Sequence, residues 1–267
     1  MVLTKNEEKN IKRCLKSLDF VDEIIIIDDY SSDNTLNQIS NIKNQNDKSK
    51  IKIYQRKLNG DFSAQRNFGV EKSRGEWVLF VDGDEEVTSE LQKEIKKVIS
   101  CELGVKREIG AYYIKRRDWF WGREVRFGDI RLIRQTGLIR LIRKNAGEWE
   151  GKVHETFQVK NQKLKVKSLK HFINHYPHQS LKEFLKEINL YSSLRADELF
   201  CQGKKSNILT IIFYPFSKFI LNYFLKLGFL DGSAGFVYAF MMSFHSFLVR
   251  TKLYMRINAN ENANVSE

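Results

Sequence analysis

The most constraining feature of this sequence is an apolar stretch that ends abruptly in carboxylates. Residues 75–85 read Gly-Glu-Trp-Val-Leu-Phe-Val-Asp-Gly-Asp-Glu, so a run of strand length that is rich in valine, leucine and aromatic residues stops at Asp82. Such a run is typical of a buried parallel strand, and ligands of open α/β sheets bind outside the carboxyl ends of the strands. The stretch therefore predicts a parallel strand with a site at its end.

Asp82 and Asp84 are separated only by Gly83, so their carboxylates are expected to leave a turn close together. Glycine adds no bulk there and permits unusual backbone angles. Adjacent carboxylates repel each other unless a positive group lies between them, and a hard divalent cation held by carboxylates and substrate phosphates is the usual solution. A solvated turn or an acidic helix N-cap is the alternative for so short a motif. We favour the cation because the motif follows a buried strand.

Strands and helices alternate up to about residue 104. Residues 1–3 predict the second half of a strand, and Ile11, Leu15 and Leu18 follow at helical spacing. The later elements are expected as strands at 21–27 and 51–54 and as helices at 35–42, 62–72 and 88–100. This alternation predicts an α/β fold with a doubly wound parallel sheet, in which residues 1–104 form a nucleotide-binding half.

The positive charge of the chain is concentrated in its middle. The formal net charge is +12, which indicates an anionic partner: nucleic acid, a membrane surface or a phosphorylated substrate. Residues 105–145 hold twelve Lys or Arg against four Asp or Glu, a net of +8. Two near copies, residues 130–134 and 139–143, flank a Gln-Thr-Gly turn and predict a basic β-hairpin. We expect residues 105–170 to form an acceptor-side half.

The C-terminal part, residues 171–257, is expected to be helical. Apolar residues recur at helical spacing in 180–200, and two markedly apolar segments follow at 208–227 and 229–248. Polar residues interrupt both segments, so we do not expect a true membrane span. Aromatic residues mixed with lysines suit a helix in the membrane interface, and a buried helical hairpin that covers the sheet domain is an equal alternative. Residues 258–267 are expected to be a disordered tail.

Four motifs in order resemble the family 2 glycosyltransferases, which have the GT-A fold. They are Thr4-Lys5-Asn6-Glu7-Glu8, Ile27-Asp28-Asp29 with residues 31–35, Gln65-Arg66-Asn67, and Val81-Asp82-Gly83-Asp84-Glu85. Val153-His154-Glu155, the basic middle and the segment 228–232 look like the branch that includes lipopolysaccharide core glucosyltransferases of the bacterial inner membrane. The resemblance implies a GT-A mixed sheet flanked by helices, with a C-terminal membrane-associating helical segment.

The resemblance also implies an activity. It is a metal-dependent, inverting transfer of a sugar from a nucleotide-diphosphate donor, with UDP-sugars expected first, to a hydroxyl of a bacterial cell-surface glycan such as the lipopolysaccharide core. The enzyme would be peripheral on the cytoplasmic face of the inner membrane. The three cysteines, Cys14, Cys101 and Cys201, lie far apart without ligand spacing, which agrees with a reduced, cytosolic setting.

Roles for individual residues follow from the matching positions. The positions expected to hold the nucleoside are Thr4, Glu7 and Asp28, with Asp29 sharing the role, because a carboxylate can accept hydrogen bonds from uracil or ribose. Those expected to line the donor site are Arg66 and Asn67, since a guanidinium can neutralise a diphosphate. The metal motif is Asp82 and Asp84, with Asp84 the more direct ligand, and the resemblance implies that the ion is Mg²⁺ or Mn²⁺.

The general base is expected at Glu155, with His154 orienting it or contacting substrate. Asp118 and Asp129 in the basic segment are the other candidates.

Two rival functions follow from the same residues. A nucleic-acid-binding protein would explain the basic middle, but the carboxylates at the strand ends would repel phosphates without a metal, so we expect no nucleic acid. The second rival is a catalytically silent relative that binds a membrane glycolipid or scaffolds an assembly. Loss of a metal carboxylate or of every plausible base would favour it, and the sequence shows neither loss.

Overall fold

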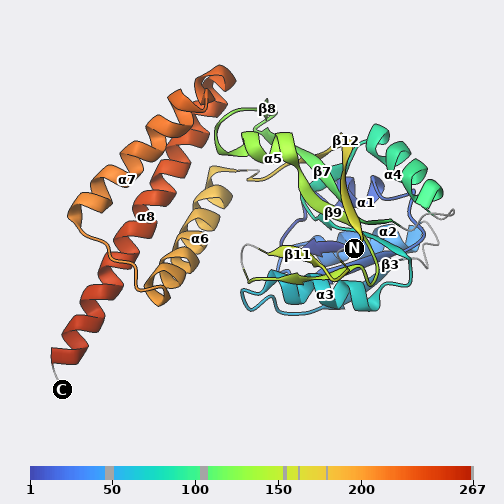
Figure 1. Ribbon diagram of the computed structural model, residues 1–267, viewed down its shortest axis with the longest axis horizontal. Coiled ribbons are helices and arrows are strands. Elements are labelled where there is room, and N and C mark those ends of the chain that lie inside the picture. Colours follow the sequence, from blue (N-terminus) through green and yellow to red (C-terminus); the bar gives the residue numbers. More distant parts are fainter. Residues whose placement is uncertain (46–50, 103–107, 153–154, 162, 179, 266–267) are drawn as a thin grey trace. The chain divides into compact units, whose positions relative to one another are not determined.

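The chain folds into two compact units (Figure 1). The computed structural model describes every residue except 46–50, 103–107, 153–154, 162, 179 and 266–267. The first unit comprises Met1–Arg117 and Leu132–Tyr176 and carries the sheets, and the second comprises Asp118–Arg131 and Pro177–Glu267 and is largely helical.

A parallel sheet forms the centre of the first unit. Its strand order is β3 (Ile51–Gln55), β2 (Ile24–Asp28), β1 (Val2–Thr4) and β5 (Val81–Asp82), and all neighbouring strands run parallel. The helices between them are α1 (Ile11–Lys16), α2 (Thr35–Gln45), α3 (Phe62–Lys72) and, after β6, α4 (Ser89–Glu102). The doubly wound α/β arrangement predicted from the alternation is confirmed.

The four consecutive isoleucines of β2 explain why this sheet has a core on both faces. Ile24 and Ile26 point into a cluster with residues of α1, α2 and α4, whereas Ile25 and Ile27 point into a second cluster with α3. Side chains alternate along a strand, so an unbroken apolar run is buried on both faces. Figure 1 shows α3 on one side of the sheet and the other three helices on the opposite side.

Residues 75–85, expected to be one strand, form three short ones. β4 (Trp77–Leu79) pairs with β9 (Leu138–Arg143), β5 joins the parallel sheet after Phe80, and β6 (Glu85–Val87) pairs with β12 (Lys165–His175). The same stretch therefore serves two sheets. The second is mixed with the order β4-β9-β7-β12-β6, in which β7 spans Ile109–Phe120 and β8 (Arg123–Val125) pairs with its end. β10 (Gly147–Glu150) and β11 (Thr156–Val159) form a separate antiparallel ribbon.

The basic β-hairpin predicted for residues 130–143 is wrong. The first near copy forms α5 (Arg131–Thr136), with no buried residue, while the second forms β9 between β4 and β7. Leu132 is 66 % exposed, whereas Leu141 and Ile142 are each 1 % exposed. Gly137 ends the helix at φ +80°, and its N–H donates to the carbonyl of Ile133, as expected of a glycine C-cap. Tertiary burial, rather than the local pattern, decides the secondary structure of each copy.

Three long helices dominate the second unit: α6 (Leu181–Cys201), α7 (Ile208–Ile220) and α8 (Gly232–Val265). Short helical turns lie before and between them, namely η1 (Gly128–Ile130), η2 (Leu221–Leu225) and η3 (Gly228–Asp231). α8 packs against both α6 and α7, and Figure 1 shows it between them. Asp231 fixes the turn between α7 and α8 by accepting hydrogen bonds from the backbone N–H groups of Arg126 and Phe127, both at 2.9 Å.

The disordered tail predicted from residue 258 is also wrong as far as Val265, because α8 continues to that residue. Leu253 is buried against α6, Ile257 packs on the same cluster, and Arg256 lies 2.6 Å from Asp197. Neither glycine nor proline occurs after Gly235, so nothing in the sequence stops the helix.

The apolar C-terminal segments are not buried in the second unit. Two helical stretches, Ile208–Leu225 and Gly228–Asn260, have the length and composition of a membrane span, and only 11 % and 28 % of their most apolar windows are buried. Within the second unit these segments do not form a buried hairpin.

Gly137→Ala should destabilise the first unit. A Cβ at this position would lie 2.6 Å from the carbonyl oxygen of Ile114, in addition to adopting positive φ. Beyond the cost of placing alanine at positive φ, we expect a loss of about 1–3 kcal/mol in the free energy of unfolding, measured by urea unfolding. Gly60→Ala is the matched control, because Gly60 also has positive φ but a Cβ there meets nothing within 4 Å. Equal losses in the two variants would contradict the close approach.

Candidate active site

Polar residues from three strands meet at the carboxyl edge of the parallel sheet. Thr4 ends β1 and pairs with Asp28, the last residue of β2, while Asp82 at the end of β5 pairs with Leu3. The backbone N–H of Asp29 donates to the carbonyl of Thr4 at 2.9 Å, which holds the two loops together. The structure thus brings together the strand-end residues that the sequence singled out.

Asp28 and Asp29 are held in different ways. Asp28 is completely buried and accepts hydrogen bonds from the Ser31 N–H at 2.9 Å, from the Ser31 hydroxyl and from Gln55 Nε2 at 3.3 Å. Asp29 accepts from the Leu58 N–H at 2.9 Å and pairs with Lys5. Both carboxylates therefore have fixed orientations, and Asp28 is the one enclosed among strand ends.

Thr4, Glu7 and Gly83 approach one another closely. A Cβ on Gly83 would lie 2.8 Å from Glu7 Cγ and 2.9 Å from Thr4 Oγ1, so the lack of bulk predicted for Gly83 is required. Gly83 is not among the glycines with positive φ, so its backbone freedom is not used. The Thr4 hydroxyl is buried without a hydrogen-bond partner among the described residues. A buried hydroxyl without a partner is a group that a bound ligand could satisfy.

Two arginines hold the side chain of Asp82. Its Oδ2 lies 2.7 Å from Arg140 Nη2, and its Oδ1 lies 3.6 Å from Arg66 Nη2. Arg140 Nη2 also contacts Glu85 Oε1 at 2.7 Å, and Glu85 Oε2 accepts from the Asp82 N–H at 2.9 Å. Burial disfavours the charged form of Asp82, but attraction to Arg140 and then Arg66 outweighs it and holds the pKa of this carboxyl far below its usual range.

Glu85 and Arg140 complete this network in the interior. Glu85 is fully buried and Arg140 is 3 % exposed. Burial raises the pKa of Glu85 although Arg140 opposes the change, while the pKa of Arg140 rises because its two carboxylate partners outweigh its own burial. We name Arg140, Glu85 and Asp82 the buried triad. Arg140 was not predicted as a site residue, and Glu85 appeared only as the last residue of the acidic motif, without a role.

Asp84 pairs with a histidine that sequence reasoning missed. Asp84 Oδ2 lies 3.1 Å from Nε2 of His175, which ends β12 and pairs with Glu85 of β6 in the antiparallel register. Burial opposes the charged form of Asp84, but His175 outweighs it and lowers the pKa of the carboxyl. His175 lies 91 positions away in the sequence, and its position as the last residue of a strand was the only signal that could have marked it.

Some of the side chains at this turn are suitable ligands for a divalent cation. Carboxylate oxygens are the ligands that Mg²⁺ and Mn²⁺ prefer, and imidazole is a further metal ligand. Asp84 and His175 face each other, while Asp82 is turned toward the arginines. Among the described residues, no group of three or more His, Cys, Asp or Glu has the geometry of a metal site. Asp84 with His175 would hold the ion, and Asp82 is the adjacent carboxylate.

Arg66 links the sheet edge to the proposed base. Its Nε donates to Glu155 Oε1 at 2.9 Å, and its guanidinium lies over the ring of Trp149 at 5.0 Å. Its Nη1 is buried without a partner among the described residues. The side-chain amide of Asn67 is instead bound to the backbone of Trp149. It donates to the Trp149 carbonyl and accepts from the Trp149 N–H. Asn67 therefore positions β10.

The remaining candidates for the base belong to the second unit or are not described. His154 falls outside the described residues. Asp118 and Asp129 both belong to the second unit. Asp129 forms ion pairs with Lys218 at 2.7 Å and Lys226 at 2.6 Å, which outweigh burial and lower its pKa. Asp129 therefore ties η1 to the end of α7.

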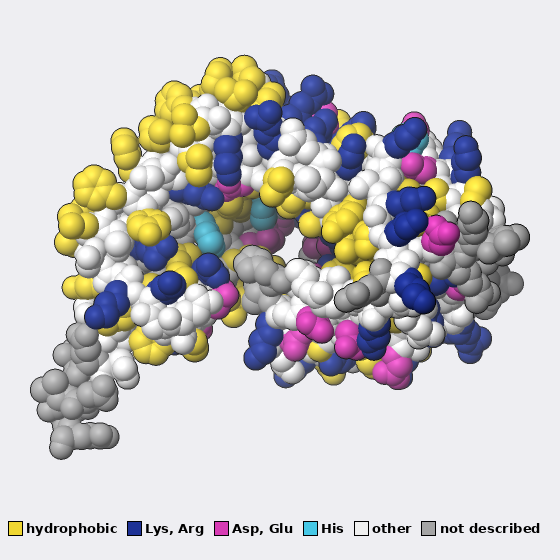
Figure 2. Space-filling model, in the orientation of Figure 1, with side chains coloured by type: hydrophobic (Ala, Val, Ile, Leu, Met, Phe, Trp, Pro, Cys, Tyr) yellow, Lys and Arg dark blue, Asp and Glu magenta, His cyan; other side chains and the backbone are white. Residues whose placement is uncertain are grey.

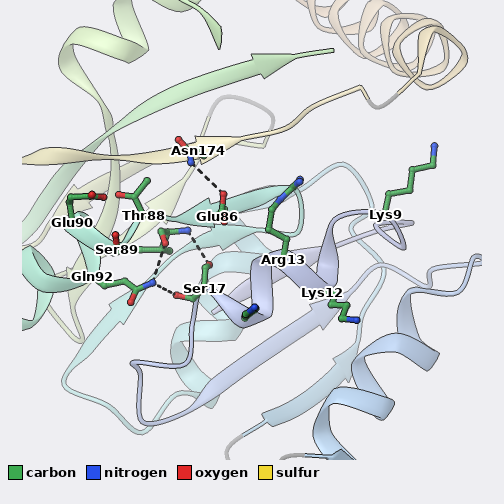
Figure 3. Close-up of a pocket in the computed structure, with 12 residues that line it drawn as sticks. Lys9, Lys12, Arg13, Ser17, Glu86, Thr88, Ser89, Glu90, Gln92 and Asn174 are labelled. Carbon is green, nitrogen blue, oxygen red and sulfur yellow. Dashed lines mark hydrogen bonds between the residues drawn. The ribbon is translucent and has the colours of Figure 1, made fainter. Parts of the chain in front are cut away.

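A groove of about 760 Å³ lies along α1, outside the predicted site residues (Figure 3). Lys12 and Lys16 line it from the helix, and Glu86 lines it from β6, accepting from Asn174 Nδ2 at 3.4 Å and from the Tyr176 hydroxyl at 2.8 Å. Burial and the bond to Glu86 raise the pKa of Tyr176 to about 12. The groove is of mixed charge and, within the described part of the chain, shares no residue with the sheet edge.

Comparison with known sequences gives a consistent result. Residues 1–168 match the sequence profile described as Glycosyl transferase family 2. The chain is 27 % identical to the lipopolysaccharide core biosynthesis glycosyltransferase LpsC of Rhizobium meliloti, over all of this chain and 95 % of that protein. It is 28 % identical to an uncharacterized glycosyltransferase of Rickettsia typhi, over 94 % of this chain and 85 % of that protein.

Comparison with solved structures supports the fold. The mannosyltransferase PcManGT of Pyrobaculum calidifontis, solved in complex with GDP-Man and Mn²⁺, matches the whole chain and 79 % of its own length at 10 % identity with a TM-score of 0.50. TarS 1–349 of S. aureus, solved with UDP-GlcNAc, matches 97 % of this chain and 90 % of its own at 17 % identity and a TM-score of 0.48. The family match and the likeness to PcManGT confirm the GT-A fold expected from the sequence motifs.

Replacing the Arg140 guanidinium of the buried triad should lower the stability of the fold. Arg140→Met leaves the buried Glu85 without a cationic partner and Asp82 with Arg66 alone, and we expect a loss of about 3–5 kcal/mol in the free energy of unfolding, measured with urea. Arg143→Met on the same strand is the control. Its partner Glu76 is 37 % exposed, so the expected loss is about 1 kcal/mol or less. A loss at Arg140 no larger than at Arg143 would show that the triad does not stabilise the fold.

Proposed function

The chain belongs to glycosyl transferase family 2, and from this premise we propose that it is an inverting glycosyltransferase. It moves a sugar from a nucleotide-diphosphate donor to a hydroxyl of a bacterial cell-surface glycan, with the lipopolysaccharide core as the acceptor expected first. The similarity to LpsC over the full length of the chain supports this acceptor class. The observation that carries the proposal is the convergence of Thr4, Asp28 and Asp82 at one sheet edge.

The nucleoside would lie against β1 and β2. Asp28 is buried at the strand end with a fixed orientation, and its carboxylate can accept from the N–H of uracil or from a ribose hydroxyl. The unpartnered Thr4 hydroxyl is a second group that a donor would satisfy. Glu7 and Asp29 line the loops on either side. These groups suit a UDP-sugar.

The diphosphate would lie beside Arg66 and the Asp82–Asp84 turn. Mg²⁺ or Mn²⁺, held by Asp84 with His175 and Asp82 nearby, would supply positive charge to the departing nucleoside diphosphate. Arg66 carries a buried Nη1 without a partner among the described residues, so it has a donor to offer to a phosphate oxygen. Asn67 contributes by fixing β10, which carries Trp149 under the Arg66 guanidinium.

The chemical step would be a single displacement at the anomeric carbon. The acceptor oxygen forms its bond to that carbon as the bond to the diphosphate oxygen breaks, and Glu155 takes the acceptor proton. Glu155 is 16 % exposed at its side chain and is oriented by Arg66 Nε at 2.9 Å, which keeps one carboxylate oxygen in place. His154, adjacent in sequence, would orient Glu155 or contact substrate.

A silent relative that only binds glycolipid is the second candidate function. The observation that favours it is the engagement of Asp82 by two arginines, which leaves Asp84 and His175 as the facing pair. In both cases the glycan that the protein binds is attached to the membrane, so we place the protein on the cytoplasmic face of the inner membrane. Donor binding that requires metal separates the two candidates.

Asp84→Asn should weaken metal-dependent donor binding by about 10–100-fold, because the amide loses the charge that attracts the cation. We would titrate the protein with UDP-glucose, UDP-galactose, UDP-N-acetylglucosamine and ADP-heptose by calorimetry, with and without Mn²⁺. Asp22→Asn is the matched control, since Asp22 is exposed and precedes β2 at the opposite edge of the sheet. Unchanged Mn²⁺-dependent affinity in Asp84→Asn would remove this residue from the metal site.

Glu155→Gln should keep donor affinity and lose about 10²–10⁴-fold in the rate of transfer, because the amide cannot accept the proton. The readout is release of nucleoside diphosphate in the presence of a lipopolysaccharide core extract, alongside the donor titration. Glu150→Gln changes an exposed glutamate of β10 and should leave both unchanged. Full turnover by Glu155→Gln would move the base to another residue.

A further inference from the structure

The outward side of α7 has the pattern of a buried face. Leu209, Ile212, Phe213 and Phe216 recur at the i, i+3, i+4, i+7 spacing that normally marks the side packed on a core. These four side chains are nevertheless between 55 % and 64 % exposed, while Ile211 on the other side is buried. Figure 2 shows hydrophobic side chains gathered along this outer surface of the second unit.

The same surface continues around the turn onto α8. Phe224, Leu225 and Leu230 are each at least half exposed, and on α8 Phe236 and Phe240 follow one helical turn apart. Ring contacts connect these parts, since the Phe219 ring lies 5.8 Å from Phe236 and 6.4 Å from Phe224. We call the exposed apolar side chains of α7, of the turn and of Phe236 and Phe240 the apolar face. A continuous exposed patch of this kind marks a contact with a membrane or another protein.

The two sides of the helical layer differ in charge. α7 contains one charged residue among 13, Lys218, and this lysine is paired with Asp129. α6 contains seven charged residues among 21 and packs on the opposite side of α8. On that side, Lys252 of α8 donates to the Asn189 carbonyl at 2.6 Å and to the Ser192 hydroxyl at 2.8 Å. The α7 surface is therefore almost free of charge, whereas α6 mixes charged side chains with exposed leucines.

Basic residues border the apolar face at both ends. Lys204 and Lys205 are exposed just before α7 begins. Arg123 is exposed at the other end, where its Nη1 lies 3.9 Å from the position of a Cβ on Gly232. Two copies joined through this face would bring like charges together, whereas anionic headgroups would neutralise them. Charge complementarity thus favours a lipid surface over a second copy of the chain.

We propose that the apolar face lies in the interface of an anionic lipid bilayer, with α7 and the start of α8 along the surface and the bordering lysines and arginine on the headgroups. This rests on the proposed function only in that the acceptor is a membrane glycan. In this arrangement the helices do not cross the bilayer. α6 packs against the side of α8 opposite to α7, so a crossing would carry the charges of α6 into the hydrocarbon. Aromatic residues with flanking lysines are the composition of interfacial helices.

The test is flotation of the full chain with vesicles of phosphatidylethanolamine and phosphatidylglycerol at 3:1, compared with phosphatidylcholine vesicles. We expect the chain to float with the anionic vesicles and to be released by alkaline carbonate. Phe213→Glu with Phe216→Glu should lower the floated fraction at least about tenfold, since two charges then face the interface. Both positions are more than half exposed, so the fold should be kept, which circular dichroism checks.

Leu190→Glu is the matched control, because Leu190 is 55 % exposed but lies on α6. Equal loss in the control, normal flotation of the double variant, or resistance of the parent chain to carbonate would overturn the interfacial arrangement. A dimer that the double variant dissociates in sedimentation, with flotation unchanged, would assign the face to a second copy. The double variant should still bind the nucleotide-sugar. If the unsubstituted chain binds no nucleotide-sugar, that result counts against the proposed function alone.

Discussion

The architecture of the site depends on one buried guanidinium. Arg140 reaches the sheet edge from β9 and contacts Glu85 and Asp82 at 2.7 Å each, and Glu85 in turn holds the backbone N–H of Asp82. Taking such charges out of water is costly unless each is paired. Arg140 from β9 supplies the cation for Glu85 and Asp82, while Arg66 and His175 supply further positive partners to Asp82 and Asp84. Without these partners, the carboxylates would have to face solvent or take up protons.

Residues 77–87 join the two sheets and so bring the strand that carries Arg140 next to the acidic turn. β4 pairs with β9, β5 pairs with β1, and β6 pairs with β12, all within residues 77–87. The donor-side strands and the strand that carries Arg140 are thus neighbours of one short segment. His175, at the end of β12, reaches Asp84 through the register of the β6 pairing. The geometry of the site follows from strand register more than from any single side-chain contact.

Sequence reasoning succeeded where local pattern and burial coincide. The four isoleucines before Asp28 predict a strand that is buried on both faces, and the carboxylates at strand ends predict an edge where they meet. It failed where burial differs between similar patterns, as in residues 131–136 and 138–143, of which one copy is an exposed helix and the other a buried strand. Arg140 and His175 were missed because their partners lie more than fifty positions away. Nothing in their immediate neighbours reveals such pairing.

The contact between Gly83 and the first loop links two segments that are distant in sequence. Glu7 Cγ and Thr4 Oγ1 occupy the space that any side chain at position 83 would need. The loop after β1 and the acidic turn after β5 are therefore packed directly against each other. A ligand that shifts one loop must shift the other. Nucleoside recognition on one side and charge neutralisation on the other would then respond together to an arriving donor.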